Sequence, residues 1–186
     1  MDYIINRRSV RKFDLTKEIS REVLKKLCEY GESAPSARRQ ESREYIIIDD
    51  TRIIEKLSSV SKGTMVLTDC NTVIAVVGKN PIDLSTPDMQ TQDLAAATEN
   101  ILIAATSMGL GSCWLGVYPR EDRMQAIKEI LNMPDEKIPF SLIALGYPLY
   151  KDTCFYDAKK LKEENIHFNR YWLCQNYQRL KQYVEY

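Results

Sequence analysis

Residues 93–108 read DLAAATENILIAATSM, and this stretch decides the fold because it predicts one long central helix. Apolar side chains surround most of the circumference of that helix, so it must be buried on more than one side. In a chain of 186 residues, a second subunit is the natural partner for part of this surface, and we expect a dimer. Residues 109–116, GLGSCWLG, follow it; Gly109 ends the helix, and the small residues predict an extended segment whose backbone can approach a flat ligand.

Two stretches on either side of this helix predict strands that are buried on both faces. Residues 70–78 and 140–146 are continuous apolar runs without the polar alternation of a half-exposed strand. Helices must therefore cover both faces of the sheet. The other predicted elements are strands at 44–49 and 112–117, a helix at 21–30 capped by Ser20, a helix at 51–61 capped by Thr51, a helix at 120–131, and loops at 33–40 and 79–87.

Length and composition favour one domain and exclude several classes of partner. A chain of 186 residues with 44% hydrophobic content can fill a single core. Its 26 basic and 26 acidic residues cancel, so no overall positive field attracts nucleic acid or an anionic membrane. The chain begins without a hydrophobic signal core, and its apolar stretches fall short of the ~20 residues of a spanning helix. We expect a soluble, cytoplasmic protein.

Cysteine and histidine usage argues against a metal site. The five cysteines form no C-x-x-C pair, and the only histidine, His167, lies seven residues from Cys174, its nearest cysteine. A Cys–His nucleophilic pair stays open, although no local signature supports it. Cys113 and Trp114 are expected to pack in the core rather than to act in catalysis.

The basic segment at residues 7–13, RRSVRKF, has the pattern of an anion clamp. If it is extended, Arg7, Ser9 and Arg11 point the same way and present two guanidinium groups and a hydroxyl to one space. Guanidinium groups meet phosphate oxygens in pairs, which suits a phosphate or a polyol. The alternative is a solvated basic turn after a short helix at residues 3–5.

These motifs, taken in order along the chain, resemble the FMN-dependent nitroreductase family. Each is weak alone, but five in the right order with compatible spacing are specific. The matching places are residues 7–13, residues 34–37 (APSA), the helix with 99–102 (ENIL), residues 109–116, and residues 145–148 (LGYP).

The resemblance implies an α+β sandwich, in which a mostly antiparallel sheet is flanked by helices and the chain forms a domain-swapped homodimer. It implies a single domain, residues 1–186, with residues 159–186 as a C-terminal arm. Two FMN sites would lie across the dimer interface. By this analogy the FMN contacts are Arg7, Arg8, Ser9 and Arg11 from one subunit, Pro35, Ser36 and Ala37 from the other, and the backbone of Leu115 and Gly116 near the flavin ring.

The resemblance also implies an activity. NADH or NADPH would reduce the flavin at N5, and a nitroaromatic, quinone or similar acceptor would then take the electrons by a ping-pong route. The flavin carries the chemistry, so no catalytic acid, base or nucleophile is required of the protein. The alternative is a flavin-binding or sensing protein with little turnover, and a third possibility is a flavin-free structural protein on the same fold.

The chain departs from the family pattern in three places. After Ala37 it reads RRQES, where an Asn and then Gln-Pro-Trp are usual, which puts flavin contacts beyond Ala37 in doubt. Phe155 stands where smaller members often have an Arg that reaches the phosphate, so Lys159 or Arg39 would have to substitute. The loop at 81–92 is short, which implies an open acceptor pocket.

Overall fold

The computed structural model describes residues 2–150 and 160–171, which fall in two compact units, Met1–Phe155 and Tyr156–Tyr186. In the described part of the second unit, Glu163–Asn165 (η5) forms a 3₁₀ turn, and the rings of His167 and Tyr171 lie 4.2 Å apart. Lys159 and Cys174 lie outside the described residues. The prediction of one domain with an arm at 159–186 stays a prediction, and the fold described below is that of the first unit.

The core of the first unit is a four-stranded sheet in which every pair of neighbouring strands is antiparallel. The strand order is β1-β2-β4-β3, so β3 is an edge strand. The two central strands are buried along almost their whole length, as their apolar runs predict. The strands are β1 (Arg43–Ile48), β2 (Thr72–Gly78), β3 (Gly111–Gly116) and β4 (Ile138–Gly146).

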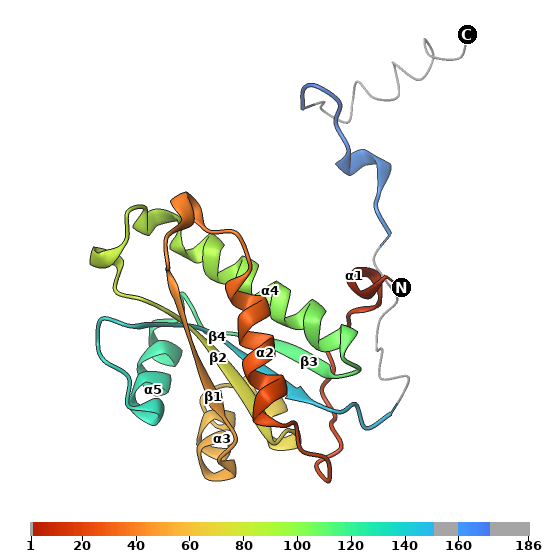
Figure 1. Ribbon diagram of the computed structural model, residues 1–186, viewed down its shortest axis with the longest axis vertical. Coiled ribbons are helices and arrows are strands. Elements are labelled where there is room, and N and C mark those ends of the chain that lie inside the picture. Colours follow the sequence, from red (N-terminus) through yellow and green to blue (C-terminus); the bar gives the residue numbers. More distant parts are fainter. Residues whose placement is uncertain (1, 151–159, 172–186) are drawn as a thin grey trace. The chain divides into compact units, whose positions relative to one another are not determined.

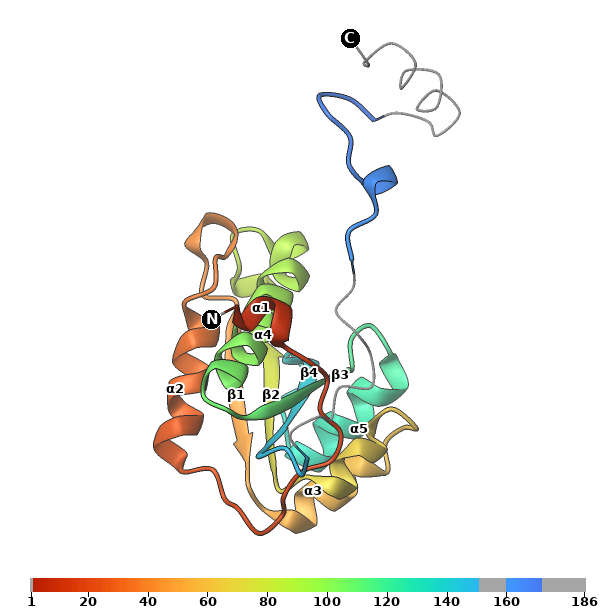
Figure 2. The same cartoon turned by 90° about the vertical axis from the view of Figure 1, so that its right-hand side faces the viewer.

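Helices cover both faces of this sheet. Figures 1 and 2 show α2 (Arg21–Glu32) and α4 (Gln90–Ser107) on one face, and α3 (Thr51–Ser58) and α5 (Glu121–Leu131) on the other. Each face has its own apolar cluster, one built on α2 and α4 and the other on α3 and α5. The expected α+β sandwich with an antiparallel sheet is confirmed, and the homodimer stays a prediction.

The long helix α4 is buried to a large extent inside its own chain. Leu94, Ile101 and Leu102 belong to the apolar cluster that α4 forms with α2 and the sheet. Ala96 and Ile103 are only half-buried. Less apolar surface is therefore left for a second subunit than the sequence pattern alone indicates.

Two predicted helix starts are wrong. Helix α4 begins at Gln90 rather than Asp93, because the 3₁₀ turn Pro87–Met89 (η4) has proline near its start and runs directly into the helix. Helix α3 is capped by Asp50 rather than Thr51, since the Asp50 side chain accepts a hydrogen bond from the Arg52 N–H at 2.9 Å. The longer predicted version of this helix also overruns its true end at Ser58.

The N-terminal segment combines both sequence interpretations. A single-turn helix, α1 (Tyr3–Asn6), is followed by an extended segment that runs beside β3 (Figure 2). The Val10 N–H donates to the Ser112 carbonyl at 2.9 Å, and Phe13 bridges Pro148. Val10 and Phe13 are buried, which fastens this segment to the sheet.

Two glycines allow this close approach. A Cβ added at Gly111 would lie 2.8 Å from the Val10 side chain, and one at Gly146 would lie 2.8 Å from Phe13. Both distances are too short for real atoms, so only glycine lets the segment dock there. Within the part of the chain that the structure describes, no helix is long and apolar enough to cross a bilayer.

Candidate functional site

The outer edge of β3 exposes backbone groups. The only bridge to this edge among residues 2–150 joins Ser9 to Ser112. Peptide groups of an edge strand alternate between the inner and the outer side, and the Ser112 carbonyl faces outward to Val10. The backbone N–H and C=O groups of Trp114 and Gly116 therefore face outward too. In agreement with this, Arg123 Nη1 donates to the Gly116 carbonyl at 3.0 Å. The Gly116 N–H points to the same open side.

A pocket of about 340 Å³ lies against this edge. Its size falls at the lower end of the range for small-molecule sites, ~300–1,000 Å³. It combines the N-terminal segment, the end of β3, the loop that leads into the 3₁₀ helix η2 (Thr64–Asp69), and α5. Its lining residues are Arg11, Ser61, Lys62, Gly63, Thr64, Val66, Cys113, Trp114, Leu115, Gly116 and Arg123.

The pocket is electropositive. Three of its lining residues, Arg11, Lys62 and Arg123, carry positive charge, and no carboxylate is among the residues that line it. Arg11 is held in place because its Nη1 donates to the Ser9 carbonyl at 3.1 Å. Such a pocket favours an anion or a ligand that develops negative charge.

The pKa of the Cys113 thiol depends on burial and on nearby positive charges. Burial raises its pKa, while the positive charges of Arg11 and Arg7 act in the opposite direction. Arg11 lines the pocket together with Cys113, whereas Arg7 pairs with Glu99 of α4, and the prediction that Arg7, Ser9 and Arg11 face one space stays a prediction. Because the net pKa shift of Cys113 is upward, this thiol is protonated at neutral pH and is a poor nucleophile.

The remaining basic residues of the segment are engaged elsewhere. Arg7 pairs with Glu99 of α4, with 3.0 Å between Nε and Oε1. Arg8 folds back on α1, where its Nη1 donates to the carbonyls of Ile5 and Arg7. Of the predicted site residues, only Arg11, Leu115 and Gly116 line the pocket, and Ser9 lies beside it through its bridge to β3.

The predicted contacts Pro35, Ser36 and Ala37 do not line this pocket. They lie at the start of α4, where Asp93 accepts hydrogen bonds from the Ala37 N–H at 2.9 Å and from Gln40 Nε2 at 2.8 Å. We define residues 34–40 as the α4 loop. Its ends are fixed to the fold, and its middle is left exposed.

A buried arginine secures the base of the α4 loop. The side chain of Arg43 is 2% exposed, and its guanidinium donates to the carbonyls of Ala34 at 2.6 Å and Asp93 at 3.1 Å. Within the loop, Arg38 and Arg39 both have positive φ, at 50° and 56°, and both are exposed. The RRQES stretch, where the chain departs from the family pattern, thus holds two arginine side chains exposed on a loop that is fixed at both ends.

Sequence reasoning missed several residues of these sites. Lys62 and Arg123 join the pocket from a loop and a helix far along the chain, and their own neighbourhoods carry no signal. Asp93 was assigned only to a helix start, and Arg43, which precedes the predicted strand at 44–49, was given no role. A charged residue next to an apolar run is the one signal that could have singled out Arg43, because burying such a charge requires partners. Among residues 2–150 and 160–171, no three His, Cys, Asp or Glu side chains converge as metal ligands do.

Comparison with known proteins supports the resemblance. The family model described as "Nitroreductase family" matches residues 4–69 and 65–147. A relative from Archaeoglobus fulgidus named "Putative NADH dehydrogenase/NAD(P)H nitroreductase" is 37% identical over 165 residues, which cover 88% of this chain and 94% of that protein.

Solved structures with the same fold include two from Clostridium species. One, described as "Putative NADH Oxidase" from Clostridium acetobutylicum, has a TM-score of 0.85 and 35% identity, and the match covers 91% of this chain and 100% of that one. Another, described as an FMN-dependent nitroreductase from Clostridium difficile, has a TM-score of 0.80 and 26% identity over 90% of this chain and 98% of that one.

Proposed function

The chain belongs to the nitroreductase family, and from this premise we propose that it is an NAD(P)H-dependent oxidoreductase that binds FMN at the outer edge of β3. The electropositive pocket at Arg11 and Gly116 is the observation that carries this proposal. Relatives named for NAD(P)H, and a neighbour described as FMN-dependent, supply the cofactor and the cosubstrate.

The residues of the pocket suit a flavin ring. A Cβ at Gly116 would meet nothing within 4 Å, so the space over its backbone is open, and its N–H points outward to donate to a ring nitrogen. When bound, FMN accepts a hydride from NAD(P)H and passes the electrons to a second substrate. Arg11 would stabilise the negative charge that reduction places on the pyrimidine edge of the ring, and Lys62 could add to this effect.

The phosphate and the second subunit complete the proposed site. We propose that Arg7, Arg8 and Ser9 hold the phosphate and ribityl chain, with Arg7 exchanging Glu99 for the phosphate. The α4 loop does not line the pocket of its own chain, so Pro35, Ser36 and Ala37 would serve the flavin of a partner in a domain-swapped homodimer. Arg39, exposed on the same loop, is available as a further phosphate contact.

The second substrate would be a nitroaromatic, a quinone or a similar acceptor, reduced by a ping-pong route. The competing proposal is a flavin-binding or sensing protein with little turnover, and the exposed Arg38 and Arg39 of the altered loop favour it to the extent that they would crowd a substrate. Steady-state oxidation of NADH and NADPH with an added quinone separates the two. Turnover on the order of 10 per second indicates an enzyme, and stoichiometric bleaching of the flavin indicates a sensor.

The cofactor is tested by the visible spectrum of the purified protein and by identification of the flavin released on heating. We expect FMN at about one per chain for a site with one flavin per subunit. Arg11→Ala should lower FMN retention, whereas Lys12→Ala should not, because Lys12 is exposed and pairs with Asp69 at 2.7 Å. A colourless protein that does not take up added FMN would refute the proposal.

A further inference from the structure

Arg123 ties the first turn of α5 to the end of β3. Its Nη1 donates to the Gly116 carbonyl at 3.0 Å, and among residues 2–150 and 160–171 its guanidinium has no other hydrogen-bond or ion-pair partner. The side chain is half-buried and lines the electropositive pocket. Arg123 therefore joins a helix to the strand end that borders this pocket.

The stability of α5 does not explain an arginine at this position. Arg123 is the third residue of the helix, after Glu121 and Asp122. The N-terminal end of a helix carries partial positive charge, so the two acidic residues are favourable there and a cation is not. The contact with Gly116 is the interaction that Arg123 gains in return.

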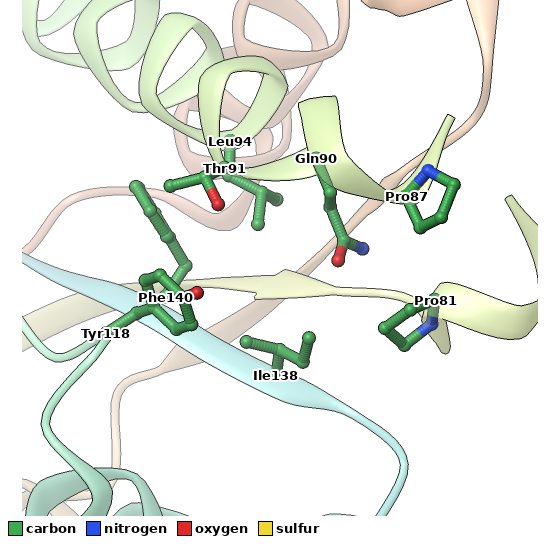
Figure 3. Close-up of a pocket in the computed structure, with 8 residues that line it drawn as sticks. All are labelled: Pro81, Pro87, Gln90, Thr91, Leu94, Tyr118, Ile138 and Phe140. Atoms are coloured by element: carbon green, nitrogen blue, oxygen red, sulfur yellow. The ribbon is translucent and has the colours of Figure 1, made fainter. Parts of the chain in front are cut away.

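Gly116 is an exposed glycine between neighbours that are held in place. It is the last residue of β3, and glycine has more backbone freedom than any other residue. Leu115 before it is buried, and the N–H groups of Val117 and Tyr118 after it both donate to the Phe140 carbonyl, at 3.2 and 3.0 Å. Figure 3 shows Tyr118 and Phe140 together at the wall of a second, smaller pocket, where their rings stack with centroids 6.3 Å apart.

The bond from Arg123 restrains this glycine. In an extended residue the N–H and the C=O point to the same side of the strand. By holding the Gly116 carbonyl outward, Arg123 also keeps the Gly116 N–H directed outward. Without this bond the glycine could leave the extended conformation, and its N–H would no longer have a single direction.

The chemistry of the flavin ring decides which atom this N–H meets. On the oxidised ring, N1 and N5 accept hydrogen bonds, whereas N3 carries a proton and N10 carries the ribityl chain. N1 belongs to the pyrimidine edge, which the proposed function assigns to Arg11. N5 is therefore the acceptor that is left for the Gly116 N–H.

We propose that Arg123 is a positioning residue, which fixes the backbone of Gly116 so that its N–H donates to N5 of bound FMN. This inference rests on the proposed function, because it needs the flavin at the outer edge of β3. Arg123 acts only through Gly116 and does not touch N5 itself. A donor at N5 draws electron density from the atom that receives the hydride, so the same bond favours reduction of the ring.

The test compares two flavins on the full-length protein, stripped of its cofactor and titrated by fluorescence. One is FMN, and the other is 5-deaza-FMN, in which a C–H group replaces N5 and cannot accept a hydrogen bond. The unaltered protein should bind FMN about three- to ten-fold more tightly, the effect of one hydrogen bond. A change that only weakens the fold or the charge of the pocket lowers both affinities and leaves their ratio unchanged.

Three variants test the role of Arg123 in this ratio. In Arg123→Met, which keeps the stem and removes the donors, FMN should be preferred less than about two-fold. Arg123→Lys should restore much of the preference, because an ammonium group can donate to the same carbonyl. Arg120→Met is the matched control, since Arg120 is exposed, precedes the same helix and makes no side-chain cap, and it should keep the full preference.

Two results would overturn the role of Arg123 and leave the flavin site in place. They are a full preference for FMN in Arg123→Met, and equal affinity of the unaltered protein for the two flavins. Binding of neither flavin by the unaltered protein would refute the proposed function, and this inference with it.

Discussion

Arg7 and Glu99 form an ion pair, with 3.0 Å between Nε and Oε1, that ties the N-terminal segment to the side of α4. The side chains are 29% and 44% exposed, so water screens this pair and its contribution to stability is small. Its effect on binding is of more interest, because Glu99 occupies the guanidinium that we propose for the FMN phosphate. The carboxylate and the phosphate would compete for the same cation.

Glu99→Gln should therefore bind FMN more tightly than the unaltered protein. The expected gain is at most about five-fold, the equivalent of an exposed ion pair of up to ~1 kcal/mol. Quenching of flavin fluorescence in a titration of the apoprotein measures it. Glu29→Gln, which removes an exposed carboxylate paired with Lys26 on α2, is the control. Weaker FMN binding in Glu99→Gln would show that Glu99 positions Arg7 instead of competing for it.

Gly116→Ala should separate binding from folding. A Cβ at Gly116 meets nothing within 4 Å, so stability should change by less than ~0.5 kcal/mol, while FMN binding should fall at least about ten-fold because the methyl group occupies the ring's place. Gly111→Ala, on the same strand, should instead lose about 1–3 kcal/mol of stability, since its Cβ would lie 2.8 Å from Val10. Urea unfolding and FMN titration measure the two effects. Retention of full FMN affinity by Gly116→Ala would place the flavin elsewhere.

Asp93→Asn should loosen the α4 loop. Both groups bonded to Asp93 are donors, so the NH₂ of the new amide would face either Gln40 Nε2 or the Ala37 N–H without an acceptor. Loss of a charge-assisted hydrogen bond destabilises the folded loop by about 1–3 kcal/mol. Trypsin should then cut after the exposed Arg38 and Arg39 faster than in the unaltered protein. The matched control is Asp88→Asn, the same change at an exposed residue. Equal cleavage rates in the two variants would mean that Asp93 does not hold the loop.

Two thiols, the half-buried Cys28 and the buried Cys70, should react slowly in the folded protein. Burial raises the pKa of both Cys28 and Cys70 from 9.0 to about 11. At pH 8 their thiolate fraction, and with it the alkylation rate, should be about 100-fold lower than for ordinary thiols. Iodoacetamide labelling read out by peptide mass spectrometry, with the protein in guanidinium as the reference, checks this. Labelling of either thiol at the unfolded rate would contradict it.

The same shifts set a direction for stability at high pH. The folded state keeps the protons of Cys28 and Cys70 to higher pH than the unfolded state does. Unfolding therefore releases protons above pH 9, so stability should fall as the pH rises from about 9 toward 11. Urea midpoints at pH 8 and pH 10 measure the change, and replacing both cysteines with alanine should reduce it.

Much of the fold follows from the sequence because its signals are local. The apolar runs at β2 and β4 have no polar alternation, and this alone predicts a sheet covered on both faces. That Arg7 and Arg11 face one space stays a prediction, since Arg11 lines the pocket and Arg7 pairs with Glu99 of α4. The details that failed are helix starts, where one residue competes with its neighbour for the same capping bond, as Asp50 does with Thr51.

The candidate site could be predicted only in part. Arg11 and Gly116 belong to motifs that are continuous in sequence, whereas Lys62 and Arg123 meet them only through the packing of α3, α5 and the sheet. The role of Asp93 is equally non-local, because its partners Ala37 and Gln40 lie far earlier in the sequence. The sequence next to these residues carries no pattern that indicates such long-range contacts.

The bridges of the N-terminal segment to Ser112 and Pro148 have a consequence for the order of assembly during synthesis. Ser9 and Phe13 emerge early from the ribosome, but their partners on β3 and after β4 are made near the end of the first unit. The N-terminal segment therefore cannot dock until these partners have been made. Docking is also expected late in folding, because the chain between the partners loses conformational entropy before the contacts repay it. Arg11 is therefore among the last side chains to reach its place, and a nascent chain cannot acquire its ligand until nearly the whole unit has been translated.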